Sequence, residues 1–257
     1  MRRRCARVRF SVLTAVSLTL VVASCDASAP ADRAVSKADN AAPAAPGSTP
    51  ADRTTSRSLR VATFNIHYIA DDQERLSWER RAGAAIAAVG ALDADIIAFQ
   101  EMETFAGGSM NPTNRQQADL AEAFPEYGWA AFGHPEEFPN TQPIAYRTSR
   151  FSAVDEGFFF FSPTPDVMYS EPWDPSWPSF CTWVVFEDGR DGRRFAVYNV
   201  HFEHRSVENR RKSAELVAAR IREQHSEMPA VLLGDFNAPR IFRPVRRFRD
   251  LGLQPVE

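Results

Sequence analysis

The segment Val-Leu-Leu-Gly-Asp-Phe-Asn-Ala-Pro, residues 231–239, places oxygen-bearing side chains directly after an apolar run. Residues 231–233 are typical of a short buried strand, because the run is bounded by Gly and Pro. Asp235 and Asn237 lie two residues apart, so they point to the same side if the chain stays extended. Two such side chains at a strand end can hold a hard cation or a phosphate. They can equally begin a turn, because Asp and Asn readily hydrogen-bond to the local backbone.

Polar residues of similar kinds end three further apolar segments: Asn65, Glu101, and Asn199 with His201. Carboxylate and amide oxygens suit Mg²⁺, which typically takes one or two carboxylates together with oxygens of the substrate. A histidine beside a phosphate can transfer a proton or neutralise charge. Four strand ends of this type favour a phosphate site with a divalent metal over four unrelated strand caps.

Several other kinds of catalytic site are excluded by the motifs that they need. The sequence has no Cys/His cluster at zinc spacing, no GxxxxGK[ST] phosphate loop and no GxSxG nucleophile turn. Of its three cysteines, Cys5 and Cys25 lie in the N-terminal region, and Cys181 lies in an apolar segment typical of a buried strand. An internal disulfide is therefore not expected.

The elements that position these residues alternate between strands and helices. Apolar and period-two segments predict strands at 59–65, 96–99, 143–146, 151–161, 180–187, 194–199 and 231–234. Apolar residues at helical spacing predict helices over 75–90, 114–123 and 207–224, the last with Ser206 as its N-cap. Strand-rich runs interleaved with a few helices favour sheets that are covered by helices.

The N-terminal region predicts export. Five arginines precede an apolar stretch of about 14 residues from Phe10 to Ala23, which is the pattern of a secretory signal and is too short to span a bilayer comfortably. The stretch ends in Val-Ala-Ser-Cys, residues 22–25, which resembles the lipobox of bacterial lipoproteins. We therefore expect a signal over 1–24, a lipid on Cys25, and a cell-envelope location on the periplasmic or cell-surface side of a membrane. An ordinary secretory signal, with Cys25 incidental, is the alternative.

Composition divides the rest of the chain into a tether and one domain. Residues 25–58 are rich in Ala, Pro, Ser, Thr, Asp and Arg, which predicts a disordered tether. The roughly 200 residues over 59–257 suffice for one domain with a sizeable core. The formal net charge is −3, and removal of a signal with five arginines and no acidic residue would leave about −8. That balance disfavours non-specific binding of nucleic acid, which depends on basic surface.

Five segments resemble the motifs of the endonuclease/exonuclease/phosphatase superfamily, the DNase-like metal-dependent phosphoesterases. They are Thr-Phe-Asn-Ile at 63–66, Ile-Ala-Phe-Gln-Glu at 97–101, Pro-Ile-Ala-Tyr-Arg at 143–147, Val-Tyr-Asn-Val-His-Phe at 197–202 and Leu-Gly-Asp-Phe-Asn-Ala at 233–238. Each segment alone is a weak signal, but their order and spacing identify the chain as a member. The Trp-rich region at 171–183 and His-Phe-Glu-His at 201–204 resemble one group of exported bacterial members.

The resemblance implies a four-layer α/β/β/α sandwich, an α+β fold of two packed, mostly antiparallel sheets flanked by helices. It also implies roles for the strand-end residues. Glu101, helped by Asn65, would hold Mg²⁺ or Mn²⁺. Asp235 would orient or deprotonate the attacking water, and Asn237 would hold a phosphate oxygen. His201 would donate to the phosphate as negative charge develops there.

Other residues are candidates for substrate binding. Arg147 and Asn199 are assigned to the substrate, with a structural salt bridge as the alternative for Arg147. The tryptophans at 173, 177 and 183 can line a substrate pocket or belong to the core. With these roles, Gly-Asp-Phe-Asn is better explained as a catalytic segment than as a turn, and Phe236 is expected in the core.

The family pattern continues beyond this segment with another acidic position and a final Asp-His pair on later strands. No Asp-His pair lies between Asn237 and Glu257. We therefore expect that the last strands are missing and that the sequence is a truncated form of a working enzyme. Loss of a positioned acid–base group costs ~10²- to 10⁴-fold in rate. A naturally short chain without activity is the alternative.

The sequence thus predicts a divalent-metal-dependent hydrolase of phosphodiesters or phosphomonoesters that uses in-line attack by an activated water. The alternatives are a catalytically inactive module that binds a phosphorylated ligand, and a fragment. The expected partners are a phosphate-ester substrate and, through the lipid anchor, a membrane. The substrate can be a nucleic acid, a phospholipid headgroup or a small phosphate ester. We expect a monomer.

Overall fold

The computed structural model describes residues 58–69, 77–102, 114–174, 176–238, 248 and 253. The predicted signal, Cys25 and all of the predicted tether except Ser58 lie outside these ranges. So do nearly all residues after 238, on which the expectation of missing strands depends. Within the described ranges, no helix is both long enough and apolar enough to cross a membrane.

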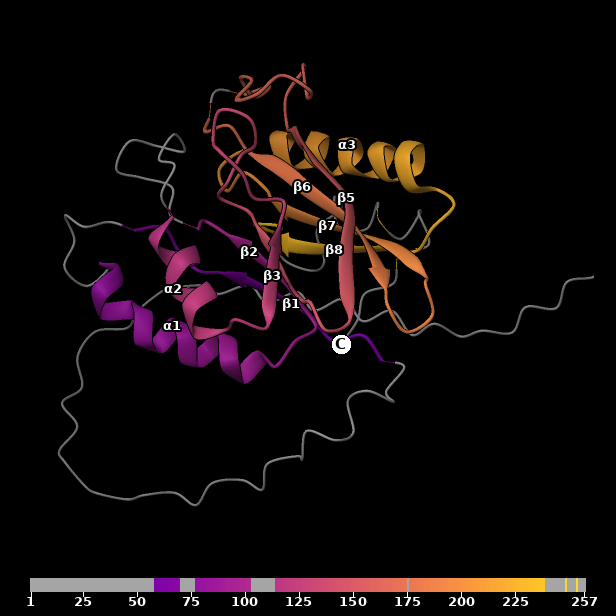
Figure 1. Ribbon diagram of the computed structural model, residues 1–257. Coiled ribbons are helices and arrows are strands. Elements are labelled where there is room, and N and C mark those ends of the chain that lie inside the picture. Colours follow the sequence, from indigo (N-terminus) through magenta and orange to yellow (C-terminus); the bar gives the residue numbers. More distant parts are fainter. Residues whose placement is uncertain are drawn as a thin grey trace, which may run out of the picture.

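In the described part of the chain, eight strands form two four-stranded sheets (Figure 1). Sheet A contains, in spatial order, β1 (Val61–Asn65), β2 (Ile96–Gln100), β4 (Ile144–Arg147) and β3 (Tyr127–Ala130). Sheet B contains β5 (Phe151–Phe160), β6 (Phe180–Asp188), β7 (Arg194–His201) and β8 (Ala230–Asp235). The β1–β2 and β7–β8 pairs are parallel, whereas the other pairs are antiparallel. The predicted α+β fold of two mostly antiparallel sheets is confirmed.

Three helices cover the outer faces of the sheets: α1 (Trp78–Leu92), α2 (Arg115–Ala123) and α3 (Val207–His225). Ser206 caps α3 as predicted, because its hydroxyl oxygen accepts a hydrogen bond from the backbone N–H of Asn209. Each predicted strand and helix is present, with small shifts at its ends. One strand, β3, was not predicted, because its sequence Tyr-Gly-Trp-Ala is short and contains a glycine.

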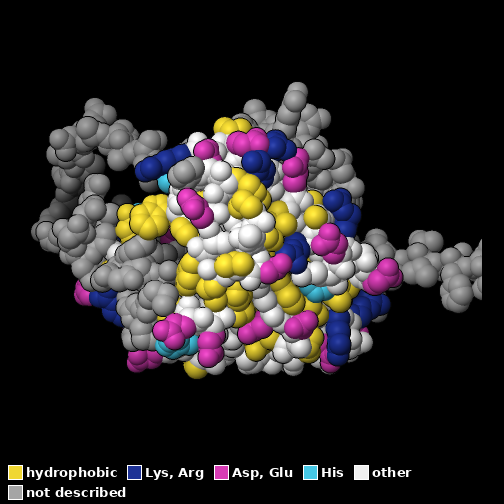
Figure 2. Space-filling model, turned by 90° about the horizontal axis from the view of Figure 1, so that it is seen from above, with side chains coloured by type: hydrophobic (Ala, Val, Ile, Leu, Met, Phe, Trp, Pro, Cys, Tyr) yellow, Lys and Arg dark blue, Asp and Glu magenta, His cyan; other side chains and the backbone are white. Residues whose placement is uncertain are grey.

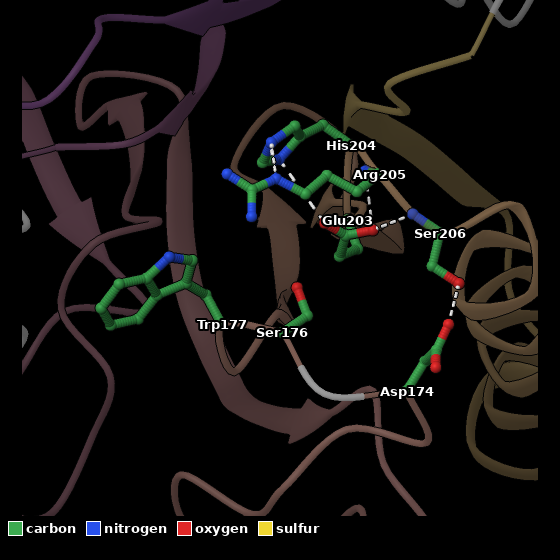
Figure 3. Close-up of a pocket in the computed structure, with 7 residues that line it drawn as sticks. All are labelled: Asp174, Ser176, Trp177, Glu203, His204, Arg205 and Ser206. Atoms are coloured by element: carbon green, nitrogen blue, oxygen red, sulfur yellow. Dashed lines mark hydrogen bonds and ion pairs between the residues drawn. The ribbon is translucent and has the colours of Figure 1, made fainter.

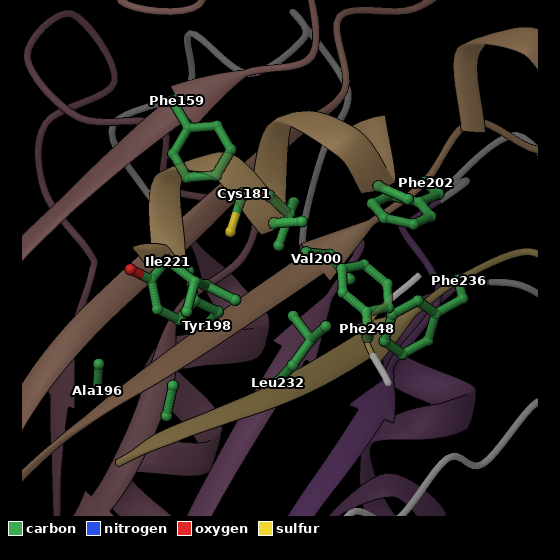
Figure 4. Close-up of a cluster of buried hydrophobic side chains, with 14 of the residues drawn as sticks. Phe159, Cys181, Ala196, Tyr198, Val200, Phe202, Ile221, Leu232, Phe236 and Phe248 are labelled. Atoms are coloured by element: carbon green, nitrogen blue, oxygen red, sulfur yellow. The ribbon is translucent and has the colours of Figure 1, made fainter. Parts of the chain in front are cut away.

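Alternation of side chains along the strands separates three apolar clusters. Between the sheets, inner-face residues pack together: Val61, Ile96, Ala98, Ile144, Val184, Phe186, Val197, Val231 and Leu233. The outward residues of β1 and β2, including Ala62 and Ile97, pack against α1 and α2. The outward residues of β7 and β8 pack against α3, as Figure 4 shows for Tyr198, Leu232 and Ile221. The layers are therefore helix, sheet, sheet and helix.

The same alternation directs polar side chains into the space between the sheets. Each polar residue lies two or four positions after an inner-face residue, so it continues that face toward the end of its strand. Asn65 follows Val61, and Asp235 follows Val231 and Leu233. His201 likewise follows Val197. The apolar interior of the sandwich thus ends in polar groups at one edge.

Candidate active site

The carboxyl ends of β1, β2, β7 and β8 meet at this edge of the sandwich. In sheet A, Asn65 pairs with Gln100 in the parallel β1–β2 register, and in sheet B, His201 pairs with Asp235 in the parallel β7–β8 register. Each pair lies at the last position of its two strands. Parallel pairing aligns the strand ends within each sheet, and the packing of the two sheets brings Asn65 next to Asp235, 170 residues later in sequence.

Asn65 connects the two sheets through its side-chain amide. Its Nδ2 atom donates to Glu101 Oε1 at 2.9 Å and to Asp235 Oδ2 at 3.1 Å. Its Oδ1 atom accepts the backbone N–H of His67 at 3.0 Å. Asn65 thus holds the two carboxylates in place by donating to both. The oxygen that a cation would need faces the His67 amide, so this arrangement does not support the predicted role of Asn65 as a metal ligand.

His201 lies within reach of both carboxylates. Its Nε2 atom is 3.6 Å from Glu101 Oε1 and 3.9 Å from Asp235 Oδ2. All three side chains remain between a fifth and a quarter exposed, so a ligand can reach them from solvent. No Lys or Arg of the described residues forms an ion pair with Glu101 or Asp235. The site therefore holds two carboxylates that have no Lys or Arg of the described residues in ion-pair contact, although the charge of Arg81 acts on Glu101 from a longer distance.

Glu101 reaches the site because the chain leaves the regular strand conformation at this residue. Its φ is 57°, in the left-handed region, which is uncommon for a residue other than glycine. Continued alternation would have turned Glu101 toward the helices, since Phe99 faces them. Such unusual backbone conformations cluster at functional sites, where the surroundings fix them.

Arg81 of α1 fixes the position of residues 66–68, the segment after β1 that contacts Glu101. The guanidinium donates to the backbone carbonyls of Ile66, His67 and Tyr68 at 2.8–3.1 Å. Burial lowers the pKa of Arg81, and the nearby charge of Glu101 partly opposes this shift. In turn, the backbone N–H of Tyr68 donates to Glu101 Oε2. Sequence reasoning missed Arg81, since an arginine on a helix is usually a solvated residue.

The segment from Asp235 to Asn237 is both a turn and part of the site. The backbone N–H of Asn237 donates to Asp235 Oδ1 at 2.9 Å, which is the Asx-turn weighed above, and Phe236 is buried as predicted. The Oδ2 atom of Asp235 stays on the side of Asn65. Asn237 Nδ2 donates to the carbonyl of Phe202 at 2.7 Å, which ties this turn to the end of β7. Residues 235–237 can therefore form a turn and be a catalytic segment at the same time.

Gly234 is required for the close approach of β8 to β7. Its φ is 135°, and a Cβ atom at this position would lie 2.0 Å from the carbonyl oxygen of Val200. No side chain fits there, so only glycine lets β8 come close enough to place Asp235 opposite His201.

Asn199 is placed beneath the site, where it cannot contact a substrate. It is fully buried, and its Nδ2 atom donates to the carbonyls of Phe99 and Gln142. Its Oδ1 atom accepts from Gln100 Nε2 at 2.7 Å, and Gln100 Oε1 accepts from Thr63. The prediction of substrate binding by Asn199 is therefore wrong. Its polar groups are satisfied between the sheets, where they support the strand ends.

Arg147 lies at the opposite edge of the sandwich. Because β4 runs antiparallel to β2, its last residue lies beside the beginning of β2. The guanidinium pairs with Asp93 at 3.0 Å and with Glu126 at 3.6 Å, and it lies over the Tyr127 ring. The prediction that Arg147 faces the phosphate is wrong, and the alternative of a structural salt bridge is correct.

The donor atoms at the edge fit a hard divalent cation. No cluster of three or more His, Cys, Asp and Glu side chains in the described part of the chain is arranged to enclose a metal ion. Mg²⁺ rarely uses such a cluster, because it keeps several waters and takes one or two carboxylates with oxygens of the substrate. Glu101 and Asp235 supply two partly exposed carboxylates without an arginine partner, which is a suitable donor set.

Comparison with known proteins places this geometry in a family. The profile of the endonuclease/exonuclease/phosphatase family matches residues 62–255. A crystal structure of a protein of this family from Bacteroides thetaiotaomicron is 30% identical, with a TM-score of 0.64 over 76% of this chain and 69% of that chain. The mannosyl-6-phosphatase of Bacteroides thetaiotaomicron is 29% identical, with a TM-score of 0.64 over 76% of this chain and 71% of that chain.

A further relative is similar in sequence. An uncharacterized protein of Acanthamoeba polyphaga mimivirus is 30% identical over 166 residues. The matched region covers 62% of this chain, and it spans 59% of the length of that protein.

Proposed function

The chain belongs to the endonuclease/exonuclease/phosphatase family, and from this membership and the site geometry we propose that it hydrolyses phosphate esters with the help of a divalent metal ion. One observation carries the proposal. Two carboxylates, Glu101 and Asp235, share the amide of Asn65 and lie within 4 Å of His201, without an ion pair to any described Lys or Arg. Partly buried carboxylates without an arginine or lysine partner are costly for stability, so two of them side by side favour a binding role.

In the proposed reaction, each residue of the cluster has one task. Mg²⁺ or Mn²⁺ on Glu101 would neutralise charge on the phosphate. Asp235, fixed by Asn65 and by the Asn237 amide, orients the attacking water and takes its proton. His201 donates to a phosphate oxygen, where negative charge grows as the new bond forms. Asn237 keeps a second amide hydrogen after its bond to Phe202, and this hydrogen is available to the phosphate.

A small phosphomonoester is the substrate class that we propose. The likeness to a mannosyl-6-phosphatase at 29% identity supports it. The charge of the surface supports it as well, because Figure 2 shows Lys and Arg side chains interspersed with Asp and Glu on the face that it presents. Binding of a nucleic acid relies on a continuous basic surface.

The test is hydrolysis by the full chain of p-nitrophenyl phosphate and bis(p-nitrophenyl) phosphate, with Mg²⁺, with Mn²⁺ and with EDTA. We expect turnover of the monoester that depends on the metal, stops with EDTA, and falls ~10²- to 10⁴-fold in Asp235→Asn. Faster hydrolysis of the diester would overturn the substrate class. Turnover that is insensitive to both EDTA and Asp235→Asn would overturn the site. Binding of inorganic phosphate without any turnover would instead identify an inactive binding module.

We also propose that the protein is exported and anchored by a lipid on Cys25. The support is the sequence of residues 1–25 alone. Expression of the full chain in a bacterium with lipoprotein processing tests it. We expect membrane-bound protein whose N-terminal peptide begins at a lipid-modified Cys25, and soluble protein for Cys25→Ser. An unmodified N-terminus at another residue would contradict lipid attachment.

A further inference from the structure

A pocket lies beside the candidate active site, at the same edge of the sandwich. Seven residues line it: Asp174, Ser176, Trp177, Glu203, His204, Arg205 and Ser206. Its volume of about 400 Å³ is within the range of small-molecule sites. One wall comes from the connection between β5 and β6, and the other comes from the connection between β7 and α3 (Figure 3).

Two features of the topology place this pocket next to the catalytic cluster. Glu203 follows His201 by two residues, so their Cα atoms are at most about 7 Å apart. The opposite wall precedes β6, whose first residues pair with the end of β7, since Cys181 lies opposite Val200. A substrate whose phosphate contacts His201 can therefore extend its alcohol part into the pocket.

The pocket wall after β7 is fixed by buried interactions. Glu203 is only 5% exposed, and its Oε2 atom accepts hydrogen bonds from the backbone N–H groups of Arg205 and Ser206. Burial alone would raise the pKa of Glu203, but these amides, with smaller contributions from Ser176 and His204, hold it below its usual range. Arg210 of α3 donates to the carbonyls of Glu203 and His204. The wall is thus preorganised rather than loose.

The two walls are tied to each other at the start of α3. The hydroxyl of Ser206 donates to Asp174 Oδ2 at 2.8 Å, and Asn209 Nδ2 donates to the Asp174 carbonyl at 3.0 Å. Asp174 Oδ1 accepts no hydrogen bond from the described residues. Arg205 uses its Nε atom on His204, and its terminal nitrogens likewise have no partner among the residues described. The pocket therefore presents both a free acceptor and free donors.

The side chains that line the pocket determine which kind of chemical group the pocket can bind. Two carboxylates stand against one guanidinium and one imidazole, so the pocket has no excess positive charge for a phosphate. It has no aliphatic side chain for an acyl chain. Its single aromatic group, Trp177, is 67% exposed, which is unusual for a residue of this size. Figure 3 shows Trp177 across the opening from His204 and Arg205.

From this combination we propose that the pocket is the subsite for the alcohol part of the substrate, and that it selects a polyhydroxylated, sugar-like group. Hydroxyl groups both donate and accept, so they match a lining that mixes Asp174, Ser176 and Arg205. The C–H face of a sugar ring covers the exposed face of Trp177. This inference rests on the proposed function, since it names the substrate of the same site.

The test compares two phosphomonoesters that differ in the alcohol part: glucose 6-phosphate, and butyl phosphate, which has neither ring nor hydroxyls. Release of inorganic phosphate gives KM and kcat for each. We expect Trp177→Ala and Asp174→Asn to raise KM for glucose 6-phosphate by roughly tenfold more than KM for butyl phosphate. The matched controls are Val167→Ala, in the same connection as Trp177, and Glu122→Gln on α2. Both residues are exposed outside the pocket, and both variants should behave like the wild type.

Equal changes of KM for both esters, or no change, would overturn the subsite. Stronger dependence on Trp177 for adenosine 5′-monophosphate than for glucose 6-phosphate would assign the pocket to a nucleobase instead. If neither ester is hydrolysed, the proposed function fails separately. The pocket is then judged by saturation-transfer NMR with methyl glucoside. Binding that is lost in Trp177→Ala and retained in Val167→Ala supports it, and absence of binding to the wild type overturns it.

Discussion

The two edges of the sandwich treat acidic residues in opposite ways. At the edge opposite the candidate active site, aspartates are matched by arginines: Asp93 with Arg60 and Arg147, Asp95 with Arg150, and Asp188 with Arg150 and Arg190, all at 2.7–3.0 Å. At the active-site edge, Glu101 and Asp235 have an amide and an imidazole as neighbours instead. Both edges of the sandwich carry acidic side chains, and they differ in whether an arginine lies in ion-pair contact with each carboxylate.

Under the proposed function, this difference separates residues that stabilise the fold from residues that bind a ligand. A half-buried carboxylate beside an arginine is satisfied and has nothing further to bind. Two neighbouring carboxylates without such a partner repel each other, and a divalent cation relieves this repulsion. The charge balance at each edge therefore indicates function more directly than the number of polar residues does.

The largest expected effect is the loss of activity when one carboxylate of the active-site edge is neutralised. Glu101→Gln and Asp235→Asn should each lower kcat by ~10²- to 10⁴-fold, because each removes a group that acts on the reacting atoms. Without metal, the melting temperature should stay equal or rise, since repulsion between the carboxylates is relieved. Asp93→Asn at the opposite edge is the control, and it should lower the melting temperature without changing kcat. The reverse pattern would contradict the comparison.

A second prediction concerns Gly234, on which the geometry of the active-site edge depends. Gly234→Ala should lower the free energy of unfolding by at least about 3 kcal/mol, because the new Cβ overlaps the backbone of Val200. Gly83→Ala is the matched control. No atom lies within 4 Å of a Cβ there, and alanine in a helix should stabilise by about 0.5–1 kcal/mol. Denaturant unfolding of both variants measures this, and equal stability would show that β8 can move away from β7.

Breaking the pairs at the opposite edge should affect stability alone. Arg150→Met leaves Asp95 without a described arginine partner and removes one of the two from Asp188. Because Arg150 and Asp188 are 13% and 10% exposed, we expect a loss of about 3 kcal/mol in unfolding free energy. Arg193→Met removes an exposed pair with Asp191 and should cost less than about 1 kcal/mol. A drop in kcat of the folded Arg150→Met protein would contradict the prediction that this edge affects stability alone.

The smallest effect is expected for Glu203, whose Oε2 atom accepts hydrogen bonds from backbone amides rather than from an arginine. Its pKa is lower in the folded protein than in the unfolded chain, so it stabilises the fold above about pH 4.3, the usual glutamate value. The contribution disappears as the pH falls through the folded pKa, because the unfolded chain takes up the proton first. Glu203→Gln should cost about 2 kcal/mol at pH 7, and the difference from the wild type should shrink as the pH falls below about 4.3. A difference that is independent of pH would contradict this assignment.

Much of this structure follows from local sequence, and the exceptions have physical causes. Apolar periodicity located the strands and helices, and Asn65, His201 and Asp235 were predicted at strand ends that the structure brings together at one edge of the sandwich. Asn199 was misassigned as a substrate-binding residue. The sequence shows that Asn199 lies near the end of a strand on the face toward the other sheet, but it does not show that the other sheet covers this position. Arg147 was misassigned, because an antiparallel strand ends at the other edge, and strand direction is a property of the whole sheet.

The pocket beside the site was only partly predictable. Trp173, Trp177 and Trp183 stand close together in sequence, yet only Trp177 lines the pocket, while the other two pack against the core next to α3. Which of them is exposed depends on a connection without regular structure, and no periodicity describes such a segment. Glu203 lies in the His-Phe-Glu-His segment that resembles one group of the family, but no role could be assigned to it, since its hydrogen-bond partners are backbone amides, which every sequence contains.

The central claim is that Glu101, whose carboxylate lies beside that of Asp235 without an arginine or lysine partner, holds a divalent cation. The most direct measurement is a titration of the metal-free protein with Mn²⁺, followed by the electron paramagnetic resonance signal of the free ion. The account predicts that the wild type and Asp93→Asn bind Mn²⁺ with similar affinity, whereas Glu101→Gln loses this binding. Binding that Glu101→Gln retains, or a wild type that binds no Mn²⁺ while correctly folded, would contradict the account.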